Sequence, residues 1–242
     1  MNKPLIDYKF RWVSQNGEDG IIAEIVRRLG LGNDLWCCEF GAWDGVFLSN
    51  TFHLVRTTNT KVVMIEGDSE RFQKLLETSS KYPNIIPLNY NVSFGKDSEN
   101  TLDKILLKTE IPFDFDVLSI DVDSYDLDIW ESLSLYHPKL VIIEINNEIK
   151  PGIFQRHSDV NWLNSFSSTI EVAKTKKYTL VCHCFNLFFI RNDLIDKISL
   201  DKKFIETPEL LFDWKWVNKL EWSIRKEERR KFKKEKTING NS

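Results

Sequence analysis

Short apolar runs alternate along the chain with longer segments in which apolar residues recur every three or four positions. The short runs have the length of buried strands, and the periodic segments are typical of helices packed on a sheet. We predict strands from Trp36 onward and over Lys61–Ile65, Asn84–Leu88, Phe115–Ile120 and Leu140–Ile145. We predict helices over Ser49–Arg56, Ser69–Ser80, Glu99–Lys108 and Asn164–Lys176, and another after Asp126. This alternation predicts an α/β fold with a doubly wound, mostly parallel sheet.

The last two apolar runs, Thr179–Cys184 and Leu187–Ile190, are separated by hairpin spacing. They therefore add one antiparallel strand, which we expect at the far side of the sheet. No linker or internal repeat divides the sequence. We expect a single domain over residues 1–242, with a core from about 14 to 191 and a helical C-terminal extension over 192–242.

The polar stretch Ser14–Gly20 precedes the first apolar periodicity of the chain. Ser14 is predicted to be the N-cap of a helix that runs to Leu29. A cap and a first helical turn explain most of this polarity. Side chains such as Gln15 and Asp19 are also suited to closing over a ligand.

The composition indicates a protein that folds around a full hydrophobic core. The chain has 242 residues, of which 42% are hydrophobic and 29% are charged. No apolar run approaches the roughly 18 residues of a membrane helix, and residues 1–13 lack the apolar centre of a signal peptide. The four cysteines lie in strand-like runs and not on C-x-x-C turns, so we expect buried free thiols, no zinc site and a cytoplasmic location.

The charge is unevenly distributed. Arg225–Lys236 holds eight basic and three acidic residues, and since the whole chain carries −3, the remainder carries −8. The basic run is either a solvated helix or a contact for an anionic partner. The acidic remainder makes nucleic acid an unlikely partner. Trp214, Trp216 and Trp222 either pack on the protein body or form a subunit contact in a homo-oligomer.

Acidic residues follow four of the predicted strands. In an open parallel sheet the carboxyl ends of the strands meet at one rim, where ligands bind. We therefore expect the following side chains to lie close together at that rim: Glu39, Glu66, Asp121, Asp123, Glu144 and Asn146.

The turn after the first strand has the pattern E-x-G-x-x-x-G, formed by Glu39, Gly41 and Gly45, with Trp43 and Asp44 inside it. A bulky and acidic turn repels a diphosphate and so differs from the G-x-G-x-x-G turn of dinucleotide folds. It favours a ligand with a positive centre, such as S-adenosylmethionine. Glu66 follows Gly41 by 25 residues, which suits a carboxylate that accepts both ribose hydroxyls.

Further polar side chains complete the expected cofactor site. Asn91 follows the third strand and is positioned to meet an adenine edge. The candidate cofactor-binding residues are Gln15, Asp19, Glu39, Gly41, Trp43, Asp44, Gly45, Asn50, Glu66, Gly67, Asn91 and Asp121.

The motif Asp121-x-Asp123-x-x-Asp126 is the most informative feature for the mechanism. Residues two apart in a strand face the same side, so Asp121 and Asp123 can join Glu144 or Asn146 as hard oxygen ligands for Mg²⁺ or another divalent cation. Such a metal would bind a substrate diol and activate its hydroxyl. Alternatively, Asp126 caps the next helix and no metal binds. Asp123 or His157 is then the candidate general base.

Four blocks taken in order resemble the FkbM-like group of class I S-adenosylmethionine-dependent methyltransferases. They are Ser14–Gly20, Glu39–Gly45, Ile65–Asp68 and Leu118–Asp126, followed by Val141–Asn146. The resemblance implies a Rossmann-like sheet of seven strands with the cofactor over its first turn, Glu66 on the ribose and Asn91 near the adenine. It implies O-methylation, commonly of sugars during polysaccharide biosynthesis or of natural-product precursors. Trp43 departs from the glycine of many class I enzymes.

Two other functions fit the residues less well. The first is a nicotinamide-dependent enzyme, although G-x-G-x-x-G and a tyrosine-x-x-x-lysine pair are missing from the sequence. The second is a non-catalytic module that keeps the cofactor pocket and recruits partners through Trp214–Ser242.

Overall fold

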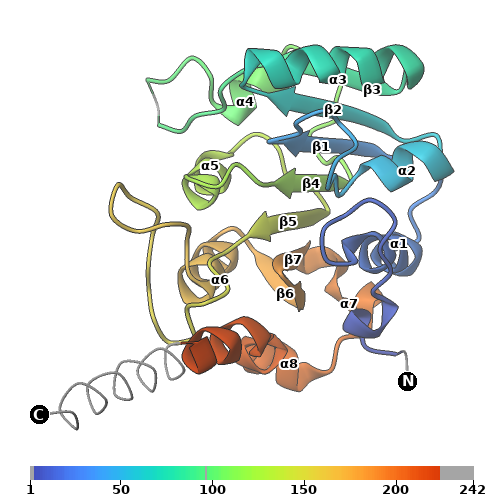
Figure 1. Ribbon diagram of the computed structural model, residues 1–242. Helices are drawn as coiled ribbons and strands as arrows, with labels where there is room; N and C mark the ends of the chain where they lie inside the picture. Colours follow the sequence, from blue (N-terminus) through green and yellow to red (C-terminus); the bar gives the residue numbers. More distant parts are fainter. Residues whose placement is uncertain (1–2, 96, 224–242) are drawn as a thin grey trace, which may run out of the picture.

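The computed structural model describes residues 3–95 and 97–223. It contains one seven-stranded sheet, which confirms the predicted fold class (Figure 1). The strands are β1 (Trp36–Phe40), β2 (Lys61–Glu66), β3 (Ile85–Asn89), β4 (Val117–Ile120), β5 (Leu140–Glu144), β6 (Tyr178–Cys184) and β7 (Asn186–Arg191).

The strand order is β3-β2-β1-β4-β5-β7-β6, and β1 to β5 are parallel. Strand β7 is antiparallel to both β5 and β6, so it lies between them. The expectation that the antiparallel strand lies at the far side of the sheet was therefore wrong, because β6 takes the edge. A single residue, Phe185 with φ 63°, joins β6 to β7 and reverses the chain.

Helices cover both faces of the sheet, at positions close to those predicted from periodicity. The α-helices are α1 (Glu18–Leu29), α2 (Phe52–Thr57), α3 (Ser69–Lys81), α4 (Leu102–Leu106), α5 (Asp126–Ser132), α6 (Phe166–Thr175), α7 (Ile195–Ile198) and α8 (Lys202–Glu206). The 3-10 helices are η1 (Leu5–Tyr8), η2 (Asn192–Leu194) and η3 (Pro208–Leu211).

The core forms two layers because successive strand residues point to opposite faces. Cys38 and its neighbours on alternate positions pack against α4, α5 and α6. Cys37 packs on the other face with residues of α1, α2, α3 and α7. All four cysteines are buried and free, as predicted.

The first helix begins later than Ser14, which corrects its expected role as the N-cap. Helix α1 begins at Glu18, and its N-cap is Gly17 in a left-handed conformation with φ 97°. The Ser14 hydroxyl is engaged elsewhere, because it donates to the Asp19 carboxylate at 2.8 Å and accepts from the Asp19 N–H at 3.1 Å. Asp68 does cap α3, since its Oδ1 accepts from the N–H of Arg71 at 2.8 Å.

The C-terminal extension is helical as far as the structure describes it. Trp214 packs against Phe212 and Trp216 against Phe185, with ring centroids 5.2 and 5.6 Å apart. The basic run 225–236 lies outside the described residues. Within the described ranges no helix has the length and apolarity to cross a bilayer. The single domain, the cytoplasmic location and the homo-oligomer stay predictions.

Gly41 controls how closely the ends of β1 and β4 approach. It has φ 77°, and a Cβ there would lie 1.7 Å from the backbone oxygen of Asp121. The obstacle is backbone and not the end of a flexible side chain, so it cannot move aside cheaply. Only glycine therefore lets the first turn pass directly beside the end of β4.

We expect Gly41→Ala to lower the free energy of unfolding by about 3 kcal/mol or more, because it combines a steric overlap with left-handed strain. Gly30→Ala is the matched control. Gly30 has φ 69° and nothing within 4 Å of the added Cβ, so only the strain of about 1 kcal/mol applies. Urea denaturation of both variants measures the difference. Equal losses would show that the close approach to Asp121 is not what requires glycine.

Candidate active site

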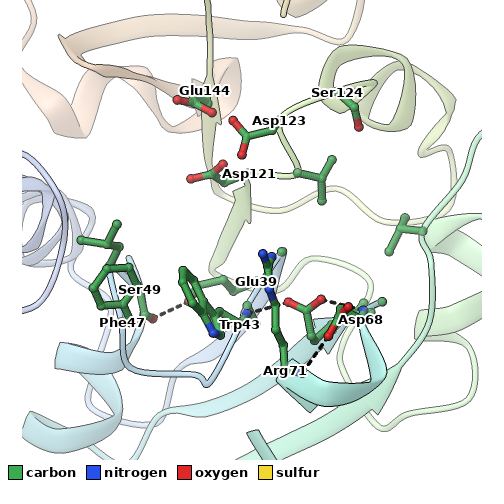
Figure 2. Close-up of a pocket in the computed structure, with 18 of the residues that line it drawn as sticks. Glu39, Trp43, Phe47, Ser49, Asp68, Arg71, Asp121, Asp123, Ser124 and Glu144 are labelled. Atoms are coloured by element: carbon green, nitrogen blue, oxygen red, sulfur yellow. Dashed lines mark hydrogen bonds between the residues drawn. The ribbon is translucent and has the colours of Figure 1, made fainter. Parts of the chain in front are cut away.

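A cavity of about 570 Å³ opens at the carboxyl ends of β1, β2, β4 and β5 (Figure 2). Its lining contains many of the residues expected from the sequence: Gln15, Glu39, Gly41, Trp43, Glu66, Gly67, Asn91, Asp121, Asp123 and Glu144. The lining does not include the other expected residues, which are Asp19, Asp44, Gly45, Asn50, Asn146 and His157.

Glu39, at the end of β1, holds the segment that leads into α2. One carboxylate oxygen accepts from the Asn50 N–H at 2.9 Å. The other accepts from the Ser49 hydroxyl at 2.7 Å and from both the N–H and the hydroxyl of Thr51. Burial raises the pKa of Glu39, although these donors counteract it. With both oxygens engaged, Glu39 shapes the cavity wall, and Asn50 belongs to the segment that it holds.

Glu66, at the end of β2, fixes two turns at once. Its Oε2 accepts from the Trp43 N–H and its Oε1 from the Asp68 N–H, each at 2.8 Å. Each oxygen keeps a further lone pair for a ligand in the cavity. The next residue is Gly67, where a Cβ would lie 2.1 Å from Oδ1 of Asn91. The side chain of Asn91 thus lies directly against the backbone beside Glu66.

An aromatic and cationic stack forms one wall of the cavity. The Trp43 ring lies 4.8 Å from the Phe47 ring, and the Arg71 guanidinium lies 4.7 Å from the Trp43 centroid. Trp43 has φ 48°, a left-handed conformation that turns the bulky residue into the wall. Sequence analysis missed Phe47 and Arg71. Arg71 had one available signal, since it is the third residue of a helix that starts directly after Glu66-Gly67-Asp68.

Asp44 and Gly45 shape the same turn from outside the cavity. Oδ1 of Asp44 accepts from the N–H groups of Val46 and Phe47 at 2.9 and 2.7 Å. A Cβ on Gly45 would lie 2.7 Å from Cδ1 of Leu75, so this glycine lets α3 pack closely on the turn. Both residues therefore position the wall that carries Trp43.

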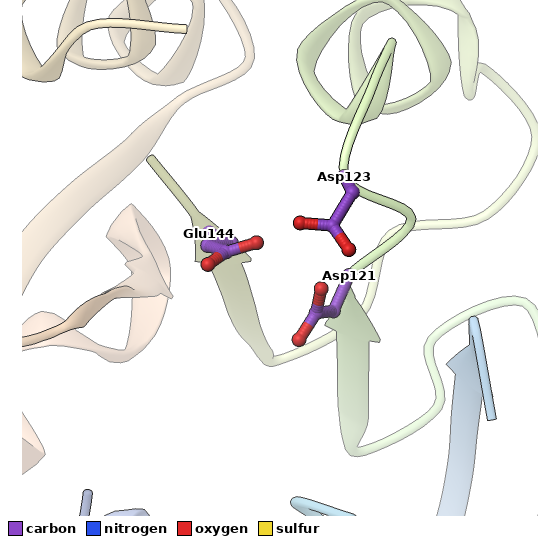
Figure 3. A group of neighbouring side chains, drawn as sticks. All are labelled: Asp121, Asp123 and Glu144. Carbon is purple, nitrogen blue, oxygen red and sulfur yellow. The ribbon is translucent and has the colours of Figure 1, made fainter. Parts of the chain in front are cut away.

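Three carboxylates lie opposite that stack (Figures 2 and 3). Asp121 follows β4, Asp123 lies two residues later, and Glu144 ends β5. One oxygen from each lies within 4.8 Å of the others. Glu144 is 6% exposed, and its Oε2 is buried without a hydrogen-bond partner. Burial and the charge of the neighbouring carboxylates raise the pKa of both Asp121 and Glu144.

Asp126 holds the loop that carries Asp123. Its two carboxylate oxygens accept from the N–H groups of Val122 and Ser124, both at 2.9 Å. The loop places Asp123 at φ 57°, a left-handed conformation unusual for a residue other than glycine. Asp126 is the first residue of α5 and not its N-cap, which is Tyr125. The third aspartate of the motif thus has a structural role in orienting the second.

Asp19 ties the N-terminal segment to α1. One oxygen accepts from the N–H groups of Trp12, Val13 and Ser14 at 2.7 to 3.0 Å, and the other lies 3.0 Å from Nδ1 of His53. Burial raises the pKa of Asp19, but His53 and the three N–H groups outweigh it and lower the value to about 2. Asp19 thereby positions the segment that brings Gln15 to the cavity.

His157 and Asn146 belong to the long loop between β5 and α6. Nδ1 of His157 accepts from the Leu163 N–H at 3.2 Å, and the His157 ring packs on Tyr125 with centroids 4.6 Å apart. Asn146 donates to the Trp162 carbonyl at 3.2 Å and accepts from the Glu148 N–H at 3.0 Å. Both side chains therefore organise the loop beside the cavity.

Comparison with solved structures identifies the fold. The chain is similar to the CurJ carbon methyltransferase, with 11% identity over 72% of this chain and 52% of that one and a TM-score of 0.50. It is also similar to a SAM dependent methyltransferase from Aquifex aeolicus, with 12% identity over 70% of this chain and 89% of that one and a TM-score of 0.45. A third similar structure is M. capricolum TrmK in complex with S-adenosyl-homocysteine, with 13% identity over 76% of this chain and 73% of that one and a TM-score of 0.45.

This chain has the fold of the class I S-adenosylmethionine-dependent methyltransferases. It spans about half the length of the CurJ protein that it matches. No protein-family model and no curated protein match its sequence. In this fold, the cavity contains Glu66 at the end of β2 and the carboxylate cluster, which follows β4 and includes the end of β5.

We expect Glu144→Gln to stabilise the methyltransferase fold in metal-free buffer, and more so at pH 8 than at pH 5. A carboxyl group whose pKa is raised by folding makes the folded state less stable as pH rises above the ordinary value of about 4.5. The neutral amide removes that cost. Scanning calorimetry should show a Tm increase of about 3 °C or more at pH 8 and a smaller one at pH 5.

The control for this experiment is Glu148→Gln, which neutralises an exposed carboxylate four residues farther along the chain. It should leave Tm nearly unchanged at both pH values. A Tm change in Glu144→Gln that is the same at pH 5 and pH 8 would contradict the repulsion assigned to the cluster.

Proposed function

We propose that the protein is an S-adenosylmethionine-dependent O-methyltransferase of the FkbM-like kind that methylates a hydroxyl of a sugar, a glycan or a similar small molecule. The observation that carries this proposal is the single cavity shared by Glu66 and by the cluster of Asp121, Asp123 and Glu144. The carboxylate suited to a ribose and the carboxylates suited to an acceptor hydroxyl thus border the same space.

The charge of the cavity supports this cofactor over a nicotinamide dinucleotide. The described lining residues include six acidic side chains and one basic side chain, Arg71. Such a lining attracts a ligand with sulfonium and ammonium groups and repels a diphosphate. Glu66 fits the ribose diol because each of its oxygens holds one N–H and retains a free lone pair. Asn91 fits the adenine edge as the nearest amide to Gly67.

The cluster fits a divalent cation such as Mg²⁺. Three carboxylate oxygens lie within 4.8 Å of one another, and Oε2 of Glu144 is buried without a donor. Hard oxygen donors of this kind suit Mg²⁺ or Ca²⁺. Asn146 is a weaker candidate ligand because its Oδ1 already accepts from Glu148. When bound, the cation would lower the pKa of an acceptor hydroxyl.

The residues of the chain then have distinct roles in methyl transfer. When bound, S-adenosylmethionine would supply the methyl group, and its sulfur would keep the electron pair of the broken carbon–sulfur bond. Asp121 and Glu144 orient the acceptor oxygen that forms the new bond to the methyl carbon. In the absence of a metal, Asp123 would take the hydroxyl proton, because it is exposed and lines the cavity, whereas His157 does not line it.

We expect Glu66→Ala to weaken binding of S-adenosylhomocysteine by about tenfold to a hundredfold, because hydrogen bonds to a charged acceptor are lost. Isothermal titration calorimetry measures the Kd. Glu66→Gln keeps the size of the side chain but can accept only one of the two N–H groups, because its amide nitrogen is a donor, so we expect it to weaken binding as well. Glu70→Ala, on the exposed side of α3, is the control. Unchanged affinity in both Glu66 variants, or no binding by the wild type, would refute the cofactor assignment.

We expect Mn²⁺, used as a probe for Mg²⁺, to bind the wild-type protein and to bind Asp121→Asn at least about tenfold more weakly, since one charged ligand is lost. Electron paramagnetic resonance of free Mn²⁺ gives the affinity without any enzyme assay. Glu148→Gln should bind as the wild type does. Equal Mn²⁺ affinity in Asp121→Asn would exclude the cluster as the metal site.

A further inference from the structure

A row of three rings lies outside the proposed catalytic machinery. Phe94 follows β3, Tyr125 precedes α5, and His157 lies in the loop after β5. The Phe94 and Tyr125 centroids are 5.0 Å apart, and those of Tyr125 and His157 are 4.6 Å apart. Three segments that are distant in sequence thus form one continuous apolar row at the carboxyl ends of the strands.

The three rings do not themselves line the cavity, but two of them follow residues that do. Tyr125 directly follows Ser124 and Asp123, which line the cavity (Figure 2). Phe94 follows another lining residue, Val92, by two positions. Two of the three rings thus lie within two residues of the cavity lining.

The row is held in place by polar contacts on its outer side. Arg156, next to His157, donates to Asp128 and Glu131 of α5 at 2.7 and 2.6 Å. The backbone N–H of His157 donates to Oδ1 of Asn164 at 3.0 Å. These bonds join the loop to the helix that follows Tyr125. The rings are thus arranged before any ligand arrives, which reduces the entropy lost on binding.

Phe94 is 41% exposed although it packs against Tyr125. An exposed ring beside hydroxyl-binding carboxylates combines an apolar surface with hydrogen-bond acceptors. A sugar ring needs both, because its C–H groups form an apolar face and its hydroxyls project from the edge.

We propose that Phe94 and Tyr125, supported by His157, form a platform that binds the apolar face of a sugar ring in the acceptor and so directs one hydroxyl to Asp123. This inference rests on the proposed function and names the residues that select its acceptor class.

The geometry favours a sugar over a flat aromatic acceptor. Phe94 is inclined by 39° to Tyr125, and Tyr125 by 73° to His157. Inserting a flat ring between two rings needs a parallel pair about 7 Å apart, twice the ordinary contact distance. These rings already touch one another. They offer a ledge for contact from one side, which suits the C–H face of a sugar.

Saturation-transfer difference NMR tests the platform with defined probes. The full chain is saturated with S-adenosylhomocysteine and Mg²⁺ and is offered three methyl glycosides, of glucose, mannose and rhamnose, with catechol as the flat aromatic probe. We expect saturation of ring C–H protons for at least one glycoside. The signal should fall by about fivefold or more in Phe94→Ala and in Tyr125→Ala, and Phe94→Trp should retain it.

Phe113→Ala is the matched control. Phe113 is 57% exposed and packs on Tyr136 with centroids 5.0 Å apart at 42°, nearly the geometry of Phe94 on Tyr125, but neither Phe113 nor Tyr136 lies within two residues of the cavity lining. It should leave the glycoside signal unchanged. Calorimetry should show the same affinity for S-adenosylhomocysteine in all of these variants.

Three results would overturn the platform: no signal from any glycoside, a signal that survives both alanine substitutions, or a substitution-sensitive signal from catechol alone. Each of them, with normal binding of S-adenosylhomocysteine, refutes the platform and leaves the proposed cofactor in place. Loss of S-adenosylhomocysteine binding by the wild type refutes the proposed function itself.

Discussion

The need to compensate buried negative charge organises the carboxyl side of this sheet. Carboxylates end β1, β2 and β5 and follow β4, and a buried charge is costly unless donors surround it. The chain supplies those donors from its own turns. Glu39 collects hydroxyl and N–H groups from the start of α2, Glu66 collects N–H groups from two turns, and Asp126 collects two from the loop after β4. The loops around the cavity are therefore shaped by the acids that they satisfy.

The hydrogen bonds that each carboxylate accepts separate the acids with a structural role from the candidate functional ones. Asp126 does not line the cavity, and Oε2 of Glu39 already accepts three hydrogen bonds, so a ligand would gain little from them. Glu144 has a buried oxygen without a donor, and its proximity to Asp121 raises the pKa of both groups. A buried carboxylate oxygen without a hydrogen-bond donor lowers the stability of the folded state. A cation or an acceptor hydroxyl would relieve it, which is why the cluster and not Glu39 carries the proposed chemistry.

Sequence patterns predicted the strands, most helices and the convergence of acids at one rim, because these depend on periodicity and on the geometry of parallel sheets. They could not distinguish a ligand-binding acid from one that holds a loop. Asp126 was expected at most to cap the next helix, yet its carboxylate accepts from the backbone N–H groups of Val122 and Ser124 and so holds the loop of Asp123. The place of β7 between β5 and β6, the start of α1 at Glu18 and the stacking of Arg71 on Trp43 depend on tertiary contacts that local patterns do not encode.

In the proposed reaction, two aromatic surfaces would separate the two ligands. Trp43, Phe47 and Arg71 line the cavity on the side of Glu66, whereas Tyr125 and Phe94 follow the lining residues Ser124 and Val92. A methyl group moves only a short distance, so donor and acceptor must meet between these surfaces. The backbone of Asp121 lies there, against Gly41 at the end of β1. The glycine that lets the two strand ends touch therefore also sets how closely the two ligands can approach.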